Sequence, residues 1–144
     1  MRPDGIAIIP ALNEAPRVGG VITSILENAP GFLPVVVDDG SRDDTAVVAR
    51  SAGALVLPLP FNLGIGGAVQ TGFRFAHRHG FRLAAQIDAD GQHDPRLLTA
   101  LAEPVRAGIV DIAVGSRRLP GSVYDGPRWR HFGLTVSAKA VGLT

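Results

Sequence analysis

Short apolar runs alternate with longer segments of helical periodicity along this chain. The runs are rich in Val, Ile, Leu and Ala and show little alternation with polar residues, which is typical of strands buried on both faces. They comprise residues 6–9, 33–37, 54–57, 83–87 and 109–114. The pattern therefore predicts five strands.

Helices are predicted between the strands. The first begins at Asn13 or Glu14 and ends before Pro30, with apolar residues at helical spacing: Val18, Val21, Ile22, Ile25 and Leu26. The second is expected to start at Ser41 as its cap and to end near Gly53. The third follows a glycine-rich loop at 62–67 and ends before Gly80, and the fourth runs from Pro95 to about Ala107.

This order of elements predicts an α/β fold with a mainly parallel sheet covered by helices on both faces. Ligands of such sheets bind beyond the carboxyl ends of the strands. Polar motifs follow four of the predicted strands there: Asn13-Glu14, Asp38-Asp39, Asp88-Ala89-Asp90 and Ser116-Arg117. We therefore expect one binding site at this edge.

Composition narrows the chemistry. The formal net charge of +1 over 144 residues gives no reason to expect a nucleic-acid partner. Without cysteine, any metal must sit on oxygen or imidazole ligands. The sequence shows no signal peptide and no stretch of about 18 apolar residues, so a cytoplasmic location is expected. From Arg117 onward there are five basic residues against one acid, and this basic tail is expected to meet an anionic partner.

The leading motif is Asp88-Ala89-Asp90-Gly91-Gln92-His93. Two carboxylates this close repel each other unless a cation lies between them, and a hard divalent cation prefers oxygen ligands. Gln92 adds a neutral oxygen, and His93 is near enough to assist. The alternative is an acidic turn before the helix at Pro95, with Asp94 as the cap.

The other acidic motifs allow a binding role or a structural one. Asp39 can accept hydrogen bonds from a nucleobase or a ribose, whereas Ser41 beside it is expected to cap a helix. Glu14 can contact a nucleoside or complement a helix dipole. His77 and His79 are two residues apart on a helix and are expected at the surface.

The loop Asn62-Leu63-Gly64-Ile65-Gly66-Gly67 does not match a dinucleotide fingerprint, because Val69 occupies the third glycine position. The loop also lacks the Gly-Lys-Ser/Thr of a P-loop, and the chain has no Gly-x-Ser-x-Gly elbow. Its glycines would serve close helix packing or approach to a nucleotide.

Together these motifs resemble family 2 glycosyltransferases of the GT-A fold, and among them the polyprenyl (dolichol) phosphate hexosyltransferases. The resemblance covers about residues 5–130 and rests on five segments in order: residues 9–14, 36–41, 62–66, 88–93 and 115–117. It implies inverting transfer of a hexose from a GDP- or UDP-sugar to a lipid phosphate, which is already ionised and needs little base catalysis.

The resemblance also implies roles for single residues. Pro10, Glu14, Val37 and Asp39 would hold the nucleoside, and Asn13, Asn62 and Gly64 join them as substrate-binding residues. Asp88, Asp90 and Gln92 would bind Mg²⁺ or Mn²⁺ on the diphosphate, with Asp88 also contacting the substrate. Asp90 and Arg117 are the implied catalytic residues, Arg117 by stabilising phosphate charge.

The chain departs from the family by stopping at Thr144. We expect one domain over 1–144, C-terminally incomplete, with a donor-binding core at 1–116 and a basic loop and the start of an interfacial helix at 117–144. The basic tail would meet lipid phosphate or headgroups at the cytoplasmic face of a membrane. Three alternatives stay open: a nucleotide-binding module without turnover (completed by a partner or a second copy), a family 2 enzyme with a glycan or small-molecule acceptor, and an NAD-dependent oxidoreductase.

Overall fold

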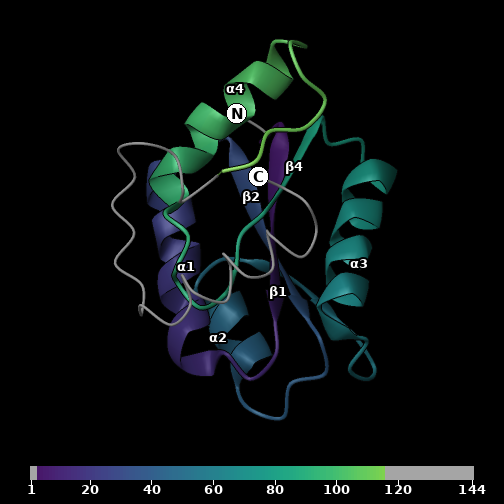
Figure 1. Cartoon of the computed structure of the whole chain (residues 1–144). Helices are drawn as coiled ribbons and strands as arrows, with labels where there is room; N and C mark the ends of the chain where they lie inside the picture. Colours follow the sequence, from purple (N-terminus) through teal and green to yellow (C-terminus); the bar gives the residue numbers. More distant parts are fainter. Residues whose placement is uncertain (1–2, 116–144) are drawn as a thin grey trace, which may run out of the picture. The chain divides into compact units, whose positions relative to one another are not determined.

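A computed structural model of the chain describes residues 3–115, and four parallel strands form its sheet (Figure 1). They are β1 (Gly5–Ala11), β2 (Phe32–Asp38), β3 (Leu55–Pro58) and β4 (Leu83–Gln86), in the order β3-β2-β1-β4. In the register, Ile8 of β1 lies opposite Val35 of β2 on one side and Gln86 of β4 on the other. The first four predicted strands and the parallel α/β sheet are confirmed.

Helices cover both faces of this sheet. They are α1 (Ala15–Asn28), α2 (Thr45–Ser51), α3 (Gly64–Arg78) and α4 (Leu98–Arg106), the last preceded by a short 3₁₀ helix, η1 (Pro95–Leu97). In Figure 1, α1 and α2 lie on one side of the strands and α3 lies on the other. Within the described residues, α3 is the only helix on its face.

The alternation of side chains along each strand builds two cores. Ala7, Ile9 and Val36 face α1, α2 and α4, whereas Ile6, Ile8 and Val35 face α3. All six are fully buried, and a fully buried Ile or Val stabilises the fold by roughly 1.5–3 kcal/mol. Because both faces are covered, the strands need apolar residues at every position, which explains the continuous runs in the sequence.

The strand order creates a switch point between β1 and β4. From β1 the chain moves outward to β2 and β3, and then α3 carries it back across the sheet to β4 on the other side of β1. Open α/β sheets bind ligands beyond the carboxyl ends of the strands at such a switch point.

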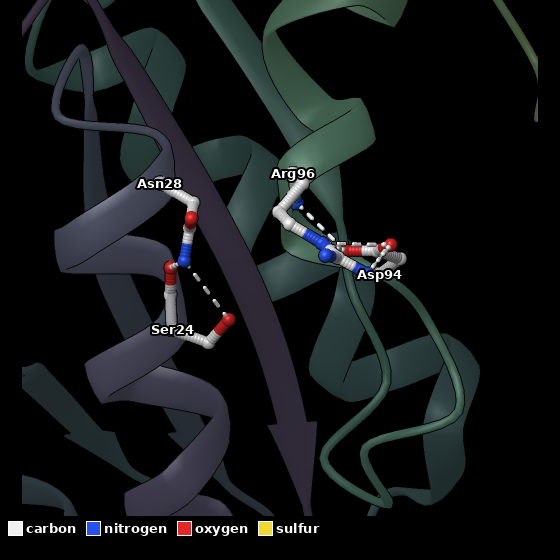
Figure 2. Close-up of polar contacts among 4 residues, drawn as sticks. All are labelled: Ser24, Asn28, Asp94 and Arg96. Atoms are coloured by element: carbon white, nitrogen blue, oxygen red, sulfur yellow. Dashed lines mark hydrogen bonds and ion pairs between the residues drawn. The ribbon is translucent and has the colours of Figure 1, made fainter.

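Two ends of helices are closed by their own side chains (Figure 2). Asp94 accepts a hydrogen bond from the backbone N–H of Arg96 at 3.0 Å and pairs with its guanidinium, so the predicted cap at Asp94 is confirmed. These bonds from Arg96 hold the pKa of Asp94 below its usual value. At the end of α1, the Asn28 side-chain amide donates to the Ser24 carbonyl at 2.8 Å.

The predicted fifth strand is wrong. Residues 109–114 form no strand, and the side chains of Ile109, Ile112 and Val114 are 76%, 78% and 80% exposed. The backbone N–H groups of Ile109 and Val110 instead donate to the Pro104 carbonyl and close the end of α4. A short apolar run forms a strand only when another strand lies beside it to pair with. Within residues 3–115 no strand adjoins this run.

Two other features differ from the sequence prediction. The helix α3 begins at Gly64, inside the segment expected as a glycine-rich loop, and Leu26 of α1 is 44% exposed although its spacing predicts a place in the buried stripe. Every strand and helix named above lies in one compact unit that ends at Ala113. No helix within residues 3–115 has the length and apolar character needed to cross a bilayer.

Candidate functional site

A pocket of about 340 Å³ lies at the carboxyl ends of the strands, at the switch point between β1 and β4. Residues following β1 and β4 form part of its wall, and the first turn of α3 forms another part. Its lining comprises Pro10, Ala11, Leu12, Glu14, Asp39, Asn62, Gly64, Ile65, Ala68, Asp88, Ala89 and Asp90. Four of these residues are acidic and none is basic, so the pocket wall carries concentrated negative charge.

Asp39 connects β2 to the start of α3. It is 4% exposed, its Oδ1 accepts a hydrogen bond from the Leu63 backbone N–H at 2.7 Å, and its own N–H donates to the Ala11 carbonyl. The next residue, Gly40, has φ +77°, and a Cβ there would lie 3.0 Å from the Asn62 nitrogen. Only glycine therefore allows the 61–62 backbone to pass close enough for Asp39 to hold Leu63.

The loop between β2 and α2 holds the start of α1. Ser41 Oγ accepts from the Asn13 N–H, Thr45 Oγ1 from the Glu14 N–H and Asp43 Oδ2 from the Ala15 N–H, at 2.9, 2.9 and 3.2 Å. Asn13 and Glu14 lie just before α1 and Ala15 is its first residue, whose N–H has no partner within the helix. The loop after β2 and the first residue of α2 supply the acceptors for all three. The predicted Ser41 cap on its own helix is therefore wrong, because α2 begins only after Asp44 and the Ser41 hydroxyl serves α1.

Asn13 completes this contact between the loops. It has φ +56°, a conformation that asparagine tolerates better than most residues, and its Oδ1 accepts from the Arg42 N–H at 2.9 Å. Its side chain does not line the pocket. The structure thus gives Asn13 a positional role, and its contact with substrate stays a prediction.

Asp43 is the residue of the same loop whose carboxylate accepts several hydrogen bonds. It accepts hydrogen bonds from the Thr45 hydroxyl, the Thr45 N–H and the Ala15 N–H, and the Thr45 hydroxyl is the main cause of a pKa below the usual value for Asp43. Because the folded pKa is lowered, this contribution to stability is present at neutral pH and above the pKa of the unfolded chain. It is lost as the pH falls through the folded value.

Thr45→Val should destabilise the protein by about 1–2 kcal/mol, because Thr45 is fully buried and its hydroxyl is the acceptor for the Glu14 N–H. Thr45→Ser keeps the hydroxyl and should cost less. Urea unfolding of the two variants measures the difference. Equal losses would show that the methyl group of Thr45 matters more than its hydrogen bonds.

Glu14 stands at the wall of the pocket with an unsatisfied acceptor. Arg17 Nε lies 3.0 Å from Glu14 Oε2 and forms an ion pair with the carboxylate. The geometry of this contact is not that of a hydrogen bond. Oε2 is buried and accepts no hydrogen bond from residues 3–115. A buried carboxylate oxygen in this state is suited to accept an N–H or O–H of a ligand.

The turn after β4 is organised around Asp88 and Asp90. The Asp88 N–H donates to His93 Nδ1 at 3.2 Å, and His93 Nε2 lies 3.6 Å from Asp88 Oδ2. The Gln92 N–H donates to Asp90 Oδ1 at 2.9 Å. The expected proximity of His93 to the acidic motif is confirmed, and its contact is with Asp88.

The pocket gathers most of the residues predicted for the site. Seven of them line it: Pro10, Glu14, Asp39, Asn62, Gly64, Asp88 and Asp90. Val37 does not, because its side chain is fully buried among the residues under α3, and Gln92 is not part of the lining. Arg117 lies outside the described residues. The substrate-binding, metal-binding and catalytic roles of all these residues stay predictions.

Sequence reasoning missed the apolar part of the pocket. Leu12 and Ile65 are 41% and 65% exposed, and Ala68 is buried. Leu12 lies within the motif at 9–14 and Ile65 within the loop at 62–66, so the motifs contained the signal. His77 on α3 and His79 directly after it are exposed, as expected.

The lining suits a divalent cation. Among residues 3–115, neither Asp88 nor Asp90 pairs with an arginine. The polar side chains beside Asp88 are His93 and Gln86, whose amide donates to Asp88 Oδ1 at 3.2 Å. Within the same residues no three His, Cys, Asp or Glu side chains form a complete metal cluster. Two carboxylates with open positions are typical of a hard cation that shares its coordination with a phosphate ligand. Asp88 and Asp90 therefore fit a Mg²⁺ or Mn²⁺ ion that arrives with such a ligand.

The comparisons with known proteins agree with this geometry. The chain is 32% identical to a polyprenol monophosphomannose synthase of Mycolicibacterium smegmatis, over 92% of this chain and 52% of the relative. Two solved structures resemble it at 28% identity and a TM-score of 0.58. One is a glucosyl-3-phosphoglycerate synthase from Mycobacterium tuberculosis with Mn²⁺, UDP and glucosyl-3-phosphoglycerate, matched over 70% of this chain and 39% of that chain. The other is a mannosyltransferase from Pyrobaculum calidifontis with GDP-Man and Mn²⁺, matched over 72% and 32%.

The match covers most of this chain but only part of the length of each relative. The chain spans about half the length of the curated proteins it matches, between 46% and 52% for the first three. The fold is that of the GT-A glycosyltransferases. The family model described as "Glycosyl transferase family 2" matches residues 6–140, and the chain therefore belongs to glycosyltransferase family 2.

Proposed function

We propose that this chain binds a nucleoside-diphosphate sugar together with Mg²⁺ or Mn²⁺ and forms the donor half of an inverting hexosyltransferase with a polyprenyl phosphate acceptor. The observation that carries the proposal is the acidic pocket at the switch point of the sheet. A diphosphate is an anion, and a wall with Glu14, Asp39, Asp88 and Asp90 repels it unless a cation is bound as well. The acidic lining thus favours a donor that binds with metal.

The residues divide into two groups along the pocket. Glu14 and Asp39 follow β1 and β2 and present carboxylates to the part where a base or a ribose would lie. Asp88 and Asp90 follow β4 and would hold the cation and, through it, the diphosphate. The apolar side chains of Leu12 and Ile65 offer contact area for a flat base.

In this reaction the protein would mainly position the substrates and the cation. When bound, the cation stabilises the negative charge that develops on the leaving diphosphate. Asp88 and Asp90 position that charge, and Glu14 and Asp39 fix the nucleoside so that the sugar is oriented for attack from one face. An acceptor phosphate is already ionised at neutral pH and needs little help from a general base. Arg117 would balance its charge.

The relatives support the classes of donor and acceptor. The M. smegmatis relative is named for a polyprenol acceptor, and the two solved structures hold UDP or GDP-Man with Mn²⁺. We propose GDP-mannose or UDP-glucose as the type of donor for this chain. We propose that the transfer takes place at a membrane, where a lipid acceptor lies, and at its cytoplasmic face.

Calorimetric titration of the full chain with GDP, UDP and NAD, each with Mn²⁺ or with a chelator, tests the proposal. We expect one nucleoside diphosphate to bind in the presence of Mn²⁺ and its affinity to fall at least about tenfold in chelator. Failure of both diphosphates to bind the folded chain would overturn the donor site. Binding of NAD alone would favour the oxidoreductase alternative.

A further inference from the structure

We propose that the outer face of α3 docks on the surface of a membrane containing anionic phospholipids. This outer face is defined by Ile65, Val69, Phe73, Arg74 and Arg78. The proposal goes beyond the transfer reaction. Of the five residues only Ile65 also lines the donor pocket, and Val69, Phe73, Arg74 and Arg78 lie outside it.

The first observation is the apolar stripe on this helix. Ile65, Val69 and Phe73 are spaced four residues apart and therefore share one side of α3. Ile65 is 65% exposed, Phe73 is 44% exposed and Val69 is half-buried. The opposite side of the helix, with Ala68, Gly72 and Ala76, already packs on the sheet. The exposed stripe is thus additional to what the fold needs.

The second observation is the charge beside the stripe. The sequence contains no Asp or Glu between Asp44 and Asp88, while four arginines fall in this interval: Arg50 on α2, and Arg74, Arg78 and Arg82 on or just after α3. Arg17, Arg96 and Arg106 each pair with a carboxylate. Within residues 3–115, Arg74 and Arg78 make no such pair. The outer face therefore presents positive charge that no acidic side chain on α3 itself or on the flanking residues 45–87 offsets.

The third observation is the shape of this face. Phe73, Arg74 and Arg78 line a shallow groove together with Gly66, Val69, Gln70 and His77. A helix that carries exposed apolar residues flanked by arginine is typical of attachment in the plane of a membrane interface. The apolar side chains enter the headgroup region while the arginines remain at phosphate level.

The helix α3 adjoins the candidate donor pocket, so attachment through α3 would affect where the pocket lies relative to the membrane. Its first turn contributes Gly64 and Ile65 to the candidate donor pocket, and its outer face continues from the same turn. Helix α2, which packs on the opposite face of the sheet, carries no part of the pocket (Figure 1). Docking through α3 would bring the pocket mouth near the headgroups, where a polyprenyl phosphate presents its anionic end.

Tryptophan fluorescence locates the docking face directly. In a Trp129→Phe background, Phe73→Trp should show blue-shifted emission with vesicles of phosphatidylcholine and phosphatidylglycerol, and no shift with phosphatidylcholine alone. The matched control is Val47→Trp on α2, a site 59% exposed on the other face of the sheet, which should show no shift with either vesicle. Circular dichroism confirms that each variant is folded.

Charge removal provides the second measurement. Arg74→Gln with Arg78→Gln should lower binding to anionic vesicles on the order of tenfold in a sedimentation assay. Arg50→Gln on α2 should leave binding nearly unchanged. Equal losses in the two variants would overturn the proposal, as would binding that survives the α3 changes. If the emission of the Phe73→Trp variant shifts with protein concentration in the absence of vesicles, the face binds a second copy of the chain instead.

The same variants separate this inference from the proposed function. Calorimetric binding of the nucleoside diphosphate with Mn²⁺ should be unchanged by Arg74→Gln with Arg78→Gln. Vesicle binding without any diphosphate binding would overturn the donor site and leave the docking face standing. Diphosphate binding without vesicle binding would overturn the docking face and leave the donor site standing.

Discussion

Asp90→Asn should lower the Mn²⁺-dependent affinity for the nucleoside diphosphate by at least about 100-fold. Asp90 lines the acidic pocket beside Asp88, and its charge is needed only if a cation is bound there. The substitution keeps the size of the side chain and an Oδ1 that can still accept the Gln92 N–H, so the turn should persist. Isothermal titration with Mn²⁺, compared with titration in chelator, measures the effect.

Asp94→Asn is the matched control for this prediction. Asp94 lies four residues along the same loop, but it caps η1 and pairs with Arg96, and it does not line the pocket. Asn is also a good cap, so donor affinity should change less than about threefold. If both variants lose affinity equally, the loss reports the general negative charge of the loop and not a ligand at Asp90. If neither does, the metal site lies elsewhere.

The parts of the site that follow strands could be predicted from the sequence. Parallel strands end at one edge, so the residues just after them must come together whatever the details of packing. Asp39, Asp88 and Asp90 follow β2 and β4 in this way, and all three line the pocket. The inference needed only the identity of the strands and their direction.

Contacts between loops could not be predicted in the same way. The side chains that hold the start of α1 come from Ser41, Asp43 and Thr45, which lie 28 or 31 residues from their partners. The local sequence favours Ser41 as the cap of its own helix, because Ser, Asp and Thr are preferred at such positions. The hydroxyl serves a neighbouring helix instead, which depends on how the two loops meet in space.

When a sheet is buried on both faces, the sequence of a strand does not indicate which face each side chain points to. Val37 comes just before Asp38-Asp39, and the family resemblance implies a nucleoside contact for it, but the pleat directs its side chain toward the core under α3. Neighbouring residues of a strand point to opposite faces, and a run of valines gives no polar alternation from which to choose the face. The run at 109–114 is ambiguous for a related reason, since its apolar character does not specify a strand partner.

Gly72→Ala should destabilise the protein by about 1–3 kcal/mol, although alanine is the better helix former. Gly72 is buried where α3 crosses β1, and a Cβ at this position would lie 2.4 Å from Ile8 Cγ2 and 2.9 Å from Ile8 Cγ1. Ile8 is fully buried and branched at Cβ, so its side chain has little freedom to move aside. The helix must therefore shift away from the sheet or the isoleucine must leave its rotamer. Urea unfolding monitored by circular dichroism measures the loss.

Gly66→Ala on the same helix separates packing from helix propensity. A Cβ at Gly66 meets no atom within 4 Å, so this variant should gain stability, by up to about 1 kcal/mol. Ile8→Ala removes the obstructing atoms, and Gly72→Ala should then cost much less in the Ile8→Ala background than in the wild type. An undiminished cost in that background would show that the helix backbone, and not Ile8, sets the limit. Because α3 also contributes Gly64 and Ile65 to the pocket, a helix displaced by Gly72→Ala should bind the nucleoside diphosphate more weakly even where the protein remains folded.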